Sequence, residues 1–97
     1  MSDIVSDKTL LLALGTGDLI PTPFELRHAP FLDGWQIKNF SLIGYRVVGV
    51  VSGHPLIADG WINTSNPVHA DVDAGWLLTQ SRFYRLGRHA DDLEALS

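Results

Sequence analysis

The stretch GWQIKNFSLIGYRVVGVVSG, residues 34–53, decides the fold class of this chain. It holds two runs rich in β-branched and aromatic residues, at positions 34–40 and 45–53, with a short glycine-containing segment between them. Runs of this composition and length are typical of β-strands. Because the segment between them is too short for a helical crossover, the two strands should pair antiparallel.

Two further segments of the same kind follow, GWINTS at residues 60–65 and GWLLTQSRFYRL at residues 75–86. Residues that favour turns, namely Gly, Pro, Asn and Asp, separate the four segments. The connections are again too short for helices, so this part of the chain predicts an antiparallel meander of about four strands.

Two short helices are expected before the first strand. Ser6 is a suitable N-cap and Gly15 a suitable C-terminal stop for a leucine-rich helix, although a buried strand is the competing interpretation. TPFE, residues 22–25, is a capping box with proline at the first helical position, and Pro30 should end that helix early. The closing residues 89–96, HADDLEAL, form either a short helix or a frayed end.

We therefore expect an α+β fold in which short N-terminal helices pack on a small antiparallel sheet. The 97 residues should form one small globular domain over residues 1–97, with a core at about residues 8–88 and frayed termini. The chain contains no cysteine, which excludes disulfides, thiolate catalysis and sulfur-ligated zinc.

The charge and the N-terminal residues indicate a soluble, cytoplasmic protein. The formal net charge of −4 argues against general nucleic-acid binding. The first residues, MSDIVSDK, lack the basic start of a secretory signal, and the apolar run at residues 10–14 is too short to cross a bilayer. We expect a cytoplasmic location and no membrane association.

Positive charge is concentrated near the end of the chain. Residues 81–90 carry three arginines and no acidic residue. Here Arg82, Tyr84, Arg85 and Arg88 combine cations with an aromatic ring, a pattern typical of protein-interface hot spots. The same pattern occurs in proteins that bind phosphates and stack bases. A structural interpretation, in which the arginines pair with surface carboxylates, is the third alternative.

The loop VSGHPLIADG, residues 51–60, contains a histidine that has two interpretations. His54, oriented by Asp59, would be a general base, but Ser52 is the only nucleophile nearby in the sequence and the chain has no nucleophile-elbow motif. The simpler interpretation is that His54 and its proline neighbour turn the chain. We expect no catalytic residue, and we include His54 and Asp59 in the candidate interaction surface.

The segment HADVD places His69, Asp71 and Asp73 on one face if it is extended, as in an oxygen-rich cation site. A calcium loop that begins at Asp71 would need an acid at its twelfth position, which is Arg82. GTGD, residues 15–18, lacks the third glycine of a dinucleotide-binding loop. A strand edge or a turn is the better interpretation of HADVD, and we expect neither a metal nor a cofactor.

Two motifs extend through the second half of the chain: a G-H-P turn followed by D-G and T-S, and a G-W…T-x-S-R-x-Y-R-L-G ending. In these motifs the chain resembles a family of small uncharacterised proteins of alphaproteobacteria. The matching positions are Gly53, His54, Pro55, Asp59, Gly60, Thr64, Ser65, Gly75, Trp76, Thr79, Ser81, Arg82, Tyr84, Arg85, Leu86 and Gly87. The resemblance covers about residues 20–88, implies a single domain and carries no activity with it.

Three functional hypotheses follow from these observations. The first is a non-enzymatic interaction or regulatory module that binds another protein, or a second copy of itself as a homo-oligomer, through the basic and aromatic final strand. The alternative is a nucleic-acid-associated regulator that binds through Arg82, Arg85, Arg88 and Tyr84. The third is a small enzyme or metal site around His54 and Asp59.

Overall fold

The computed structural model describes residues 6–40 and 44–95 of the chain. In these ranges the elements are α1 (Asp7–Leu14), α2 (Pro23–His28), β1 (Phe31–Phe40), β2 (Gly44–Ser52), β3 (Gly60–Asn63), β4 (Pro67–Asp71), β5 (Trp76–Thr79), β6 (Phe83–Leu86) and α3 (Ala90–Ala95). The chain is thus a small α+β fold with short helices, as the sequence predicts. None of the described helices is both long enough and apolar enough to span a bilayer.

Local signals set both ends of α1. The Ser6 hydroxyl oxygen accepts a hydrogen bond from the Thr9 amide at 3.2 Å, and the Gly15 amide donates to the Leu12 carbonyl at 3.1 Å. Gly15 has a φ of +68°, a conformation that favours glycine at the end of a helix. These bonds confirm the helical interpretation of the leucine-rich run, in which Leu11 is the buried leucine.

The capping box begins α2 as predicted. The Thr22 hydroxyl oxygen accepts from the Glu25 amide at 3.1 Å, and the Glu25 carboxylate accepts from the Thr22 amide at 2.9 Å. The helix ends at His28, because Ala29 precedes Pro30 and is extended, with φ −71° and ψ 142°. At the other end of the chain, the short-helix alternative for the closing residues is confirmed by α3.

The six strands form one mixed sheet in the order β3-β2-β1-β6-β5-β4. Strands β1, β2 and β3 are successive antiparallel neighbours, and so are β4, β5 and β6. The two meanders meet where β1 pairs with β6 in parallel, with Phe31 opposite Arg85 and Leu32 opposite Leu86. The expectation of about four antiparallel strands is therefore wrong in the number of strands and in the direction of the central pair.

Residues 75–86, expected as one strand, form two because Thr79 turns the chain. The Thr79 hydroxyl oxygen accepts from the amides of Ser81 and Arg82, each at 3.2 Å, and the Thr79 amide donates to the Arg82 carbonyl at 3.0 Å. A hydroxyl that bonds the backbone of the next residues in this way promotes a turn. The segment HADVD forms the end of β4, at the edge of the sheet, and the start of the turn after it.

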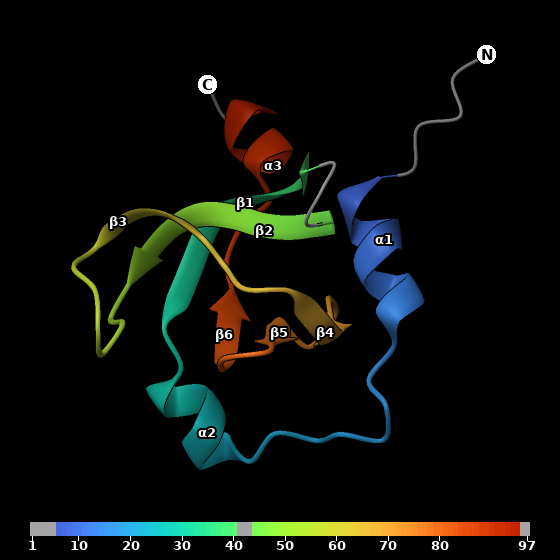
Figure 1. Ribbon diagram of the computed structural model, residues 1–97, viewed down its shortest axis with the longest axis vertical. Helices are drawn as coiled ribbons and strands as arrows, with labels where there is room; N and C mark the ends of the chain where they lie inside the picture. The colour runs from blue at the N-terminus through green and yellow to red at the C-terminus, as the bar shows by residue number, and fades with distance from the viewer. Residues whose placement is uncertain (1–5, 41–43, 96–97) are drawn as a thin grey trace.

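The sheet curls, because its two edge strands are neighbours in the sequence. Residues 64–66 join β3 to β4 and span no more than roughly 14 Å, whereas the edges of a flat six-stranded sheet are roughly 24 Å apart. The Thr64 amide donates to the Val47 carbonyl at 2.8 Å, which holds this connection against β2. Figure 1 shows the result, with β1 and β2 lying above β4, β5 and β6.

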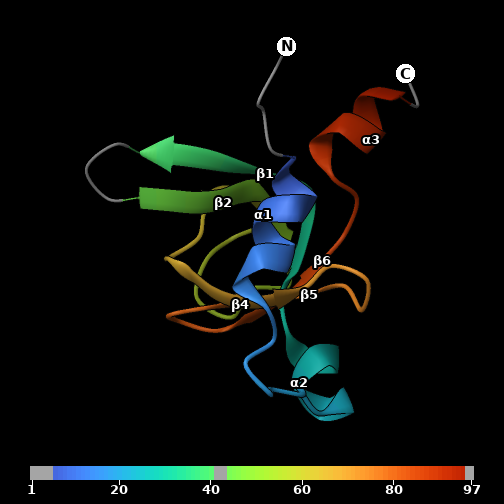
Figure 2. The same ribbon diagram turned by 90° about the vertical axis from the view of Figure 1, so that its right-hand side faces the viewer.

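The core fills the space inside the curl. The buried residues that form it are Leu11, Leu32, Trp35, Val47, Val51, Ala70, Leu77 and Tyr84. They come from α1 and from five of the six strands, so burial of this apolar surface holds the two meanders together. Figure 2 shows α1 lying across the open side between the β1–β2 pair and β4.

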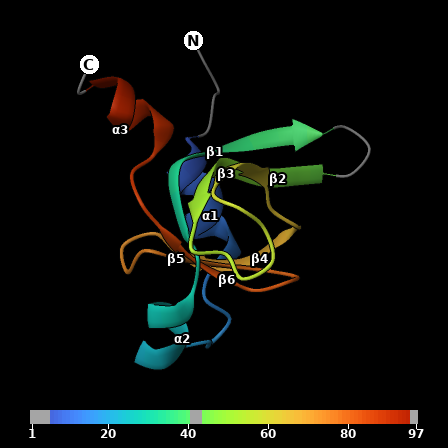
Figure 3. The ribbon, with the colours of Figure 1, turned by 90° about the vertical axis from the view of Figure 1, so that its left-hand side faces the viewer.

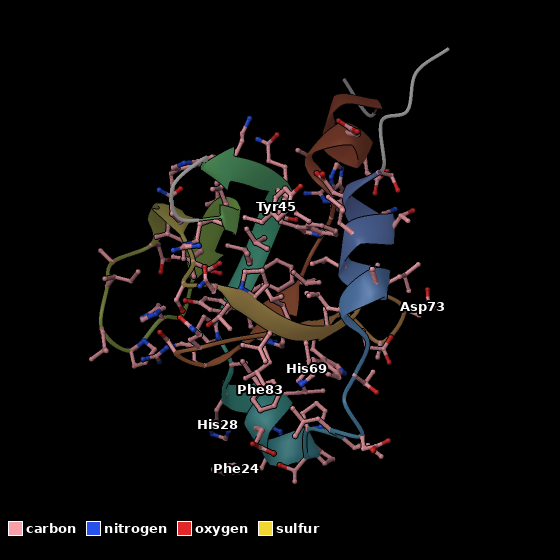
Figure 4. The ribbon with its side chains drawn as sticks, turned by 45° about the vertical axis from the view of Figure 1, so that its right-hand side comes forward. Phe24, His28, Tyr45, His69, Asp73 and Phe83 are labelled. Carbon is pink, nitrogen blue, oxygen red and sulfur yellow. The ribbon has the colours of Figure 1, made fainter. Side chains whose placement is uncertain are left out.

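A second layer covers the outer side of β5 and β6. Trp76 is buried outside the interior core and makes an edge contact with Phe83, with 5.8 Å between ring centroids. α2 contacts β6, and the Arg85 amide donates to the Pro30 carbonyl at 2.8 Å. Figure 4 shows Phe83 and His69 on the side of the strands that faces α2. Trp76 and Phe83 are therefore shielded by the segment around α2.

Candidate interaction surface

A row of three side chains crosses the outer side of β3, β2 and β1, and a fourth, Arg88, extends it beyond β6. Trp61 lies opposite Val50 in the β2–β3 pair, and Val50 lies opposite Asp33 in the β1–β2 pair. The Asp33 carboxylate accepts from the Arg88 amide at 2.8 Å and lies 3.3 Å from the Arg88 guanidinium. Directly opposite residues point to the same face of a sheet. The row therefore runs along one face, from the apolar pair Trp61 and Val50 to the ion pair of Asp33 and Arg88.

Phe31 and Arg85 widen this row. Phe31 lies two residues before Asp33 and therefore on the same face of β1, and the Arg85 guanidinium lies 5.8 Å from the centre of the Phe31 ring. Gly87 allows this packing, because a Cβ atom at Gly87 would lie 2.5 Å from both Asp33 Oδ1 and Phe31 Cζ. We call the resulting set the outer patch, and its residues are Phe31, Asp33, Val50, Trp61, Arg85 and Arg88.

The apolar end of the outer patch is exposed. Trp61 is 58% exposed and Val50 is 48% exposed. The loop that joins their two strands also exposes Leu56 and Ile57. Figure 1 shows β3 and this loop on the opposite side of the molecule from α1, and Figure 3 turns that side toward the viewer. Neighbouring exposed apolar side chains that are bordered by polar groups mark interaction sites on protein surfaces.

The charged end of the outer patch has one paired and one unpaired cation. Burial opposes ionisation of Asp33, but the hydrogen bonds and positive charge of Arg88 outweigh it and hold the pKa of the Asp33 carboxyl below its ordinary value. Arg85 donates from Nε to the Ala29 carbonyl at 3.0 Å, and it forms no ion pair within residues 6–40 and 44–95. Arg85 is therefore available to an acidic group on a partner.

The three arginines of the final segment do not form one surface. Arg85 and Arg88 belong to the outer patch, whereas Arg82 lies near His54 and Tyr84. Burial, and secondly the charge of Arg82, lower the pKa of His54, while burial raises the pKa of Tyr84 against a smaller opposing effect of Arg82. The structure thus separates the predicted surface residues into two places.

Tyr84 is a core residue. It is 4% exposed and belongs to the interior cluster, and its ring lies 6.1 Å from the ring of His54, which covers it from the loop between β2 and β3. A buried ring cannot stack on a nucleic-acid base. The aromatic members of the exposed basic surface are Trp61 and Phe31 instead.

His54 and Asp59 bind the backbone of their own loop. His54 Nδ1 accepts from the Leu56 amide at 3.0 Å, and Asp59 Oδ1 accepts from the Gly53 amide at 3.2 Å. An aspartate that oriented His54 as a base would stabilise the imidazolium and raise its pKa, whereas the pKa of His54 is lowered. This geometry agrees with the interpretation of the GHP segment as a turn.

The residues considered as cation ligands have separate environments. Asp71 Oδ1 accepts from the Ala74 amide at 3.0 Å and shapes the turn after β4. The His69 ring packs so closely on Gly17 that a Cβ atom there would lie 2.4 Å from it. Over the described part of the chain, no three histidine or acidic side chains are grouped as a metal site.

The sequence of β2 points away from an exposed end of the outer patch. β2 carries valines at both alternating sets of positions, with Val47 and Val51 facing the core and Val48 and Val50 on the opposite face. Such a run is typical of a strand covered on both sides. In the structure the outer face of β2 is covered at Val48, which is buried, and open at Val50 and at Trp61 beside it on β3.

Comparison with known proteins gives one match. The profile of DUF6634, a family of unknown function, matches residues 3–97. No curated protein and no solved structure matches the chain. This match, over almost the entire chain, agrees with the expectation of an uncharacterised family.

Proposed function

We propose that this chain, which belongs to DUF6634, a family of unknown function, is a non-enzymatic protein-interaction module. The proposal rests on the surface of the structure. The binding site of the module is the outer patch. The observation that carries the proposal is the exposed pair of Trp61 and Val50 on the same face of the sheet as Arg85 and Arg88, with Asp33 between the apolar pair and the cations. Tryptophan and arginine are the residue types most enriched in the energetic centres of protein interfaces.

The patch favours a partner segment that combines an apolar and an acidic side chain. The apolar side chain packs on Trp61 and Val50, and the acidic one pairs with Arg85, which has no ion-pair partner in the part of the chain that the structure describes. β3 lies at one end of the strand order, so an extended partner segment is able to add to its free edge through backbone hydrogen bonds.

This proposal changes which residues of the final segment carry function. Arg85 and Arg88 are retained from the original surface, Trp61 and Phe31 replace Tyr84 as its aromatic members, and a regulatory role in the cytoplasm remains part of the proposal. The nucleic-acid alternative loses its stacking ring with the burial of Tyr84. Gly87, which belongs to the sequence motif, has no side chain and so leaves room for Asp33 and Phe31 within the patch.

The test is quantitative affinity capture from the native cell extract, followed by measurement of binding with the purified partner. Trp61→Ser should weaken binding roughly tenfold or more, since hot-spot tryptophans contribute at least that much. Leu12→Ser is the matched control, because Leu12 on α1 is also 58% exposed. Both variants should keep the wild-type circular dichroism spectrum and thermal midpoint.

Two results would overturn the proposal. One is a partner that binds the Trp61→Ser variant as tightly as the wild type. The other is binding of single-stranded DNA or RNA at about 150 mM salt, with an affinity that falls steeply with salt, which would favour the nucleic-acid regulator.

A further inference from the structure

A hollow of about 430 Å³ opens between α1, the start of β2 and the start of β4. It is lined by Leu10, Leu11, Leu14, Ile37, Gly44, Tyr45, Asn66 and Pro67. Figure 4 shows Tyr45 on β2 beside α1. None of the outer-patch residues lines this hollow, so it is a separate feature of the molecule.

The hollow persists because α1 is held at both ends. At its start, Asp7 Oδ2 accepts from the Ile37 amide at 3.1 Å and from His89 Nε2 at 2.7 Å. Beyond its end, the Gly15 carbonyl accepts from the Ala70 amide at 3.1 Å. These two attachments fix the helix over the gap in the curled sheet, and Leu11 fills only the part of the gap that reaches the core.

The lining selects against charge. Five of its eight residues have aliphatic side chains or a proline ring, and none has a carboxylate, amine, guanidinium or imidazole group. The polar side chains are the Tyr45 phenol and the Asn66 amide. Arg46 donates to the Asn66 side-chain oxygen and to the Tyr45 carbonyl. The Asn66 side-chain oxygen therefore already accepts a hydrogen bond, and its NH₂ group can donate one to a ligand.

We propose that this hollow binds a small neutral molecule with an apolar body and one hydrogen-bonding group, a site independent of the outer patch. Its volume lies in the range of small-molecule sites, which are commonly about 300–1,000 Å³ and mostly apolar. An ionised ligand is disfavoured, because no lining residue carries a charged group to pair with it, and the nearby Arg46 guanidinium is already hydrogen-bonded to Asn66 and Tyr45. The polar group of the ligand lies at the Asn66 amide or the Tyr45 phenol.

The experiment compares two probes that differ in charge, 2-naphthol and 2-naphthoate. Each is titrated into the labelled full-length protein and followed by NMR. 2-Naphthol should bind with a dissociation constant of about 1 mM or lower, as expected for a ligand of its size, and 2-naphthoate at least tenfold more weakly. Nuclear Overhauser contacts from bound 2-naphthol should reach the methyl groups of Leu14 and Ile37.

A pair of variants on the same helix supplies the control. Leu14→Trp should fill the hollow and weaken 2-naphthol binding at least tenfold, whereas Leu12→Trp adds the same ring outside the lining and should leave binding unchanged. The absence of 2-naphthol binding, or contacts from the probe to Trp61 instead of Leu14, would overturn the proposal. The contacts are measured on the wild-type protein, so they decide the question even if Leu14→Trp does not fold.

Discussion

Replacing Asp7 by alanine removes the acceptor that joins α1 to β1 and to the end of the chain. Asp7 Oδ2 accepts from the Ile37 amide at 3.1 Å and from His89 Nε2 at 2.7 Å. His89 is 8% exposed, and its Nδ1 already accepts from the Asp91 amide at 3.0 Å. The neutral ring therefore carries its proton on Nε2, and this proton has Asp7 as its acceptor.

The size of the effect follows from the two donors left without a partner. A buried donor that loses its acceptor costs about 1–3 kcal/mol. The Asp7 side chain is 23% exposed, so water can replace part of the lost hydrogen bonding. Loss of an acidic side chain from the first turn of α1 adds about 0.3–1 kcal/mol. Asp7→Ala should therefore lower the free energy of unfolding by about 2–4 kcal/mol. In a domain of this size that lowers the thermal midpoint by roughly 10–20 °C.

Urea unfolding monitored by circular dichroism measures this change. The slope of the unfolding free energy against urea concentration, the m-value, should stay constant. Asp7→Asn retains one acceptor oxygen and should cost roughly half as much. Asp91→Ala is the control, because the Asp91 side chain is 84% exposed and 3.8 Å from His89, while its backbone amide remains in place. Asp91 is also an acidic residue in the first turn of a helix, so its loss should change stability by no more than about 1 kcal/mol. Equal stability of Asp7→Ala and Asp91→Ala would refute the assignment of Asp7 as a tether.

Two further predictions concern the capping box and the loop histidine. Thr22→Ala should lower the free energy of unfolding by about 1 kcal/mol, since the Glu25 amide loses its acceptor; an unchanged thermal midpoint would mean that this cap does not stabilise the protein. An NMR titration should place the pKa of His54 below 6.5, and Arg82→Gln should move it upward. The unfolded chain then binds the proton more readily, so stability should fall as the pH drops through 6.5 and should not depend on His54 well above it. A His54 pKa at or above 6.5 would contradict this prediction.

The sequence by itself determined the features that depend on bonds between near neighbours. The ends of the first two helices were predictable because Ser6, Thr22 and Gly15 act on backbone groups three residues away, and because Pro30 restricts the residue before it. The strand character of residues 34–40 and 45–52 followed from composition in the same way. The turn at Thr79 carried a local signal too, since its hydroxyl bonds the next residues, but serine and threonine turns are weak signals within a strand-like run.

The tertiary structure alone decided which strands are neighbours and which faces are open. The parallel pairing of β1 with β6 brings Phe31 beside Arg85, and the tether of Asp7 joins it to His89, 82 positions away. Contacts of this kind leave no spacing pattern in the chain, because they depend on how the whole sheet curls around its core. For the same reason, the valines of β2 look alike in sequence, yet Val47 and Val51 are buried inside the curled sheet while Val50, on its outer face, is exposed.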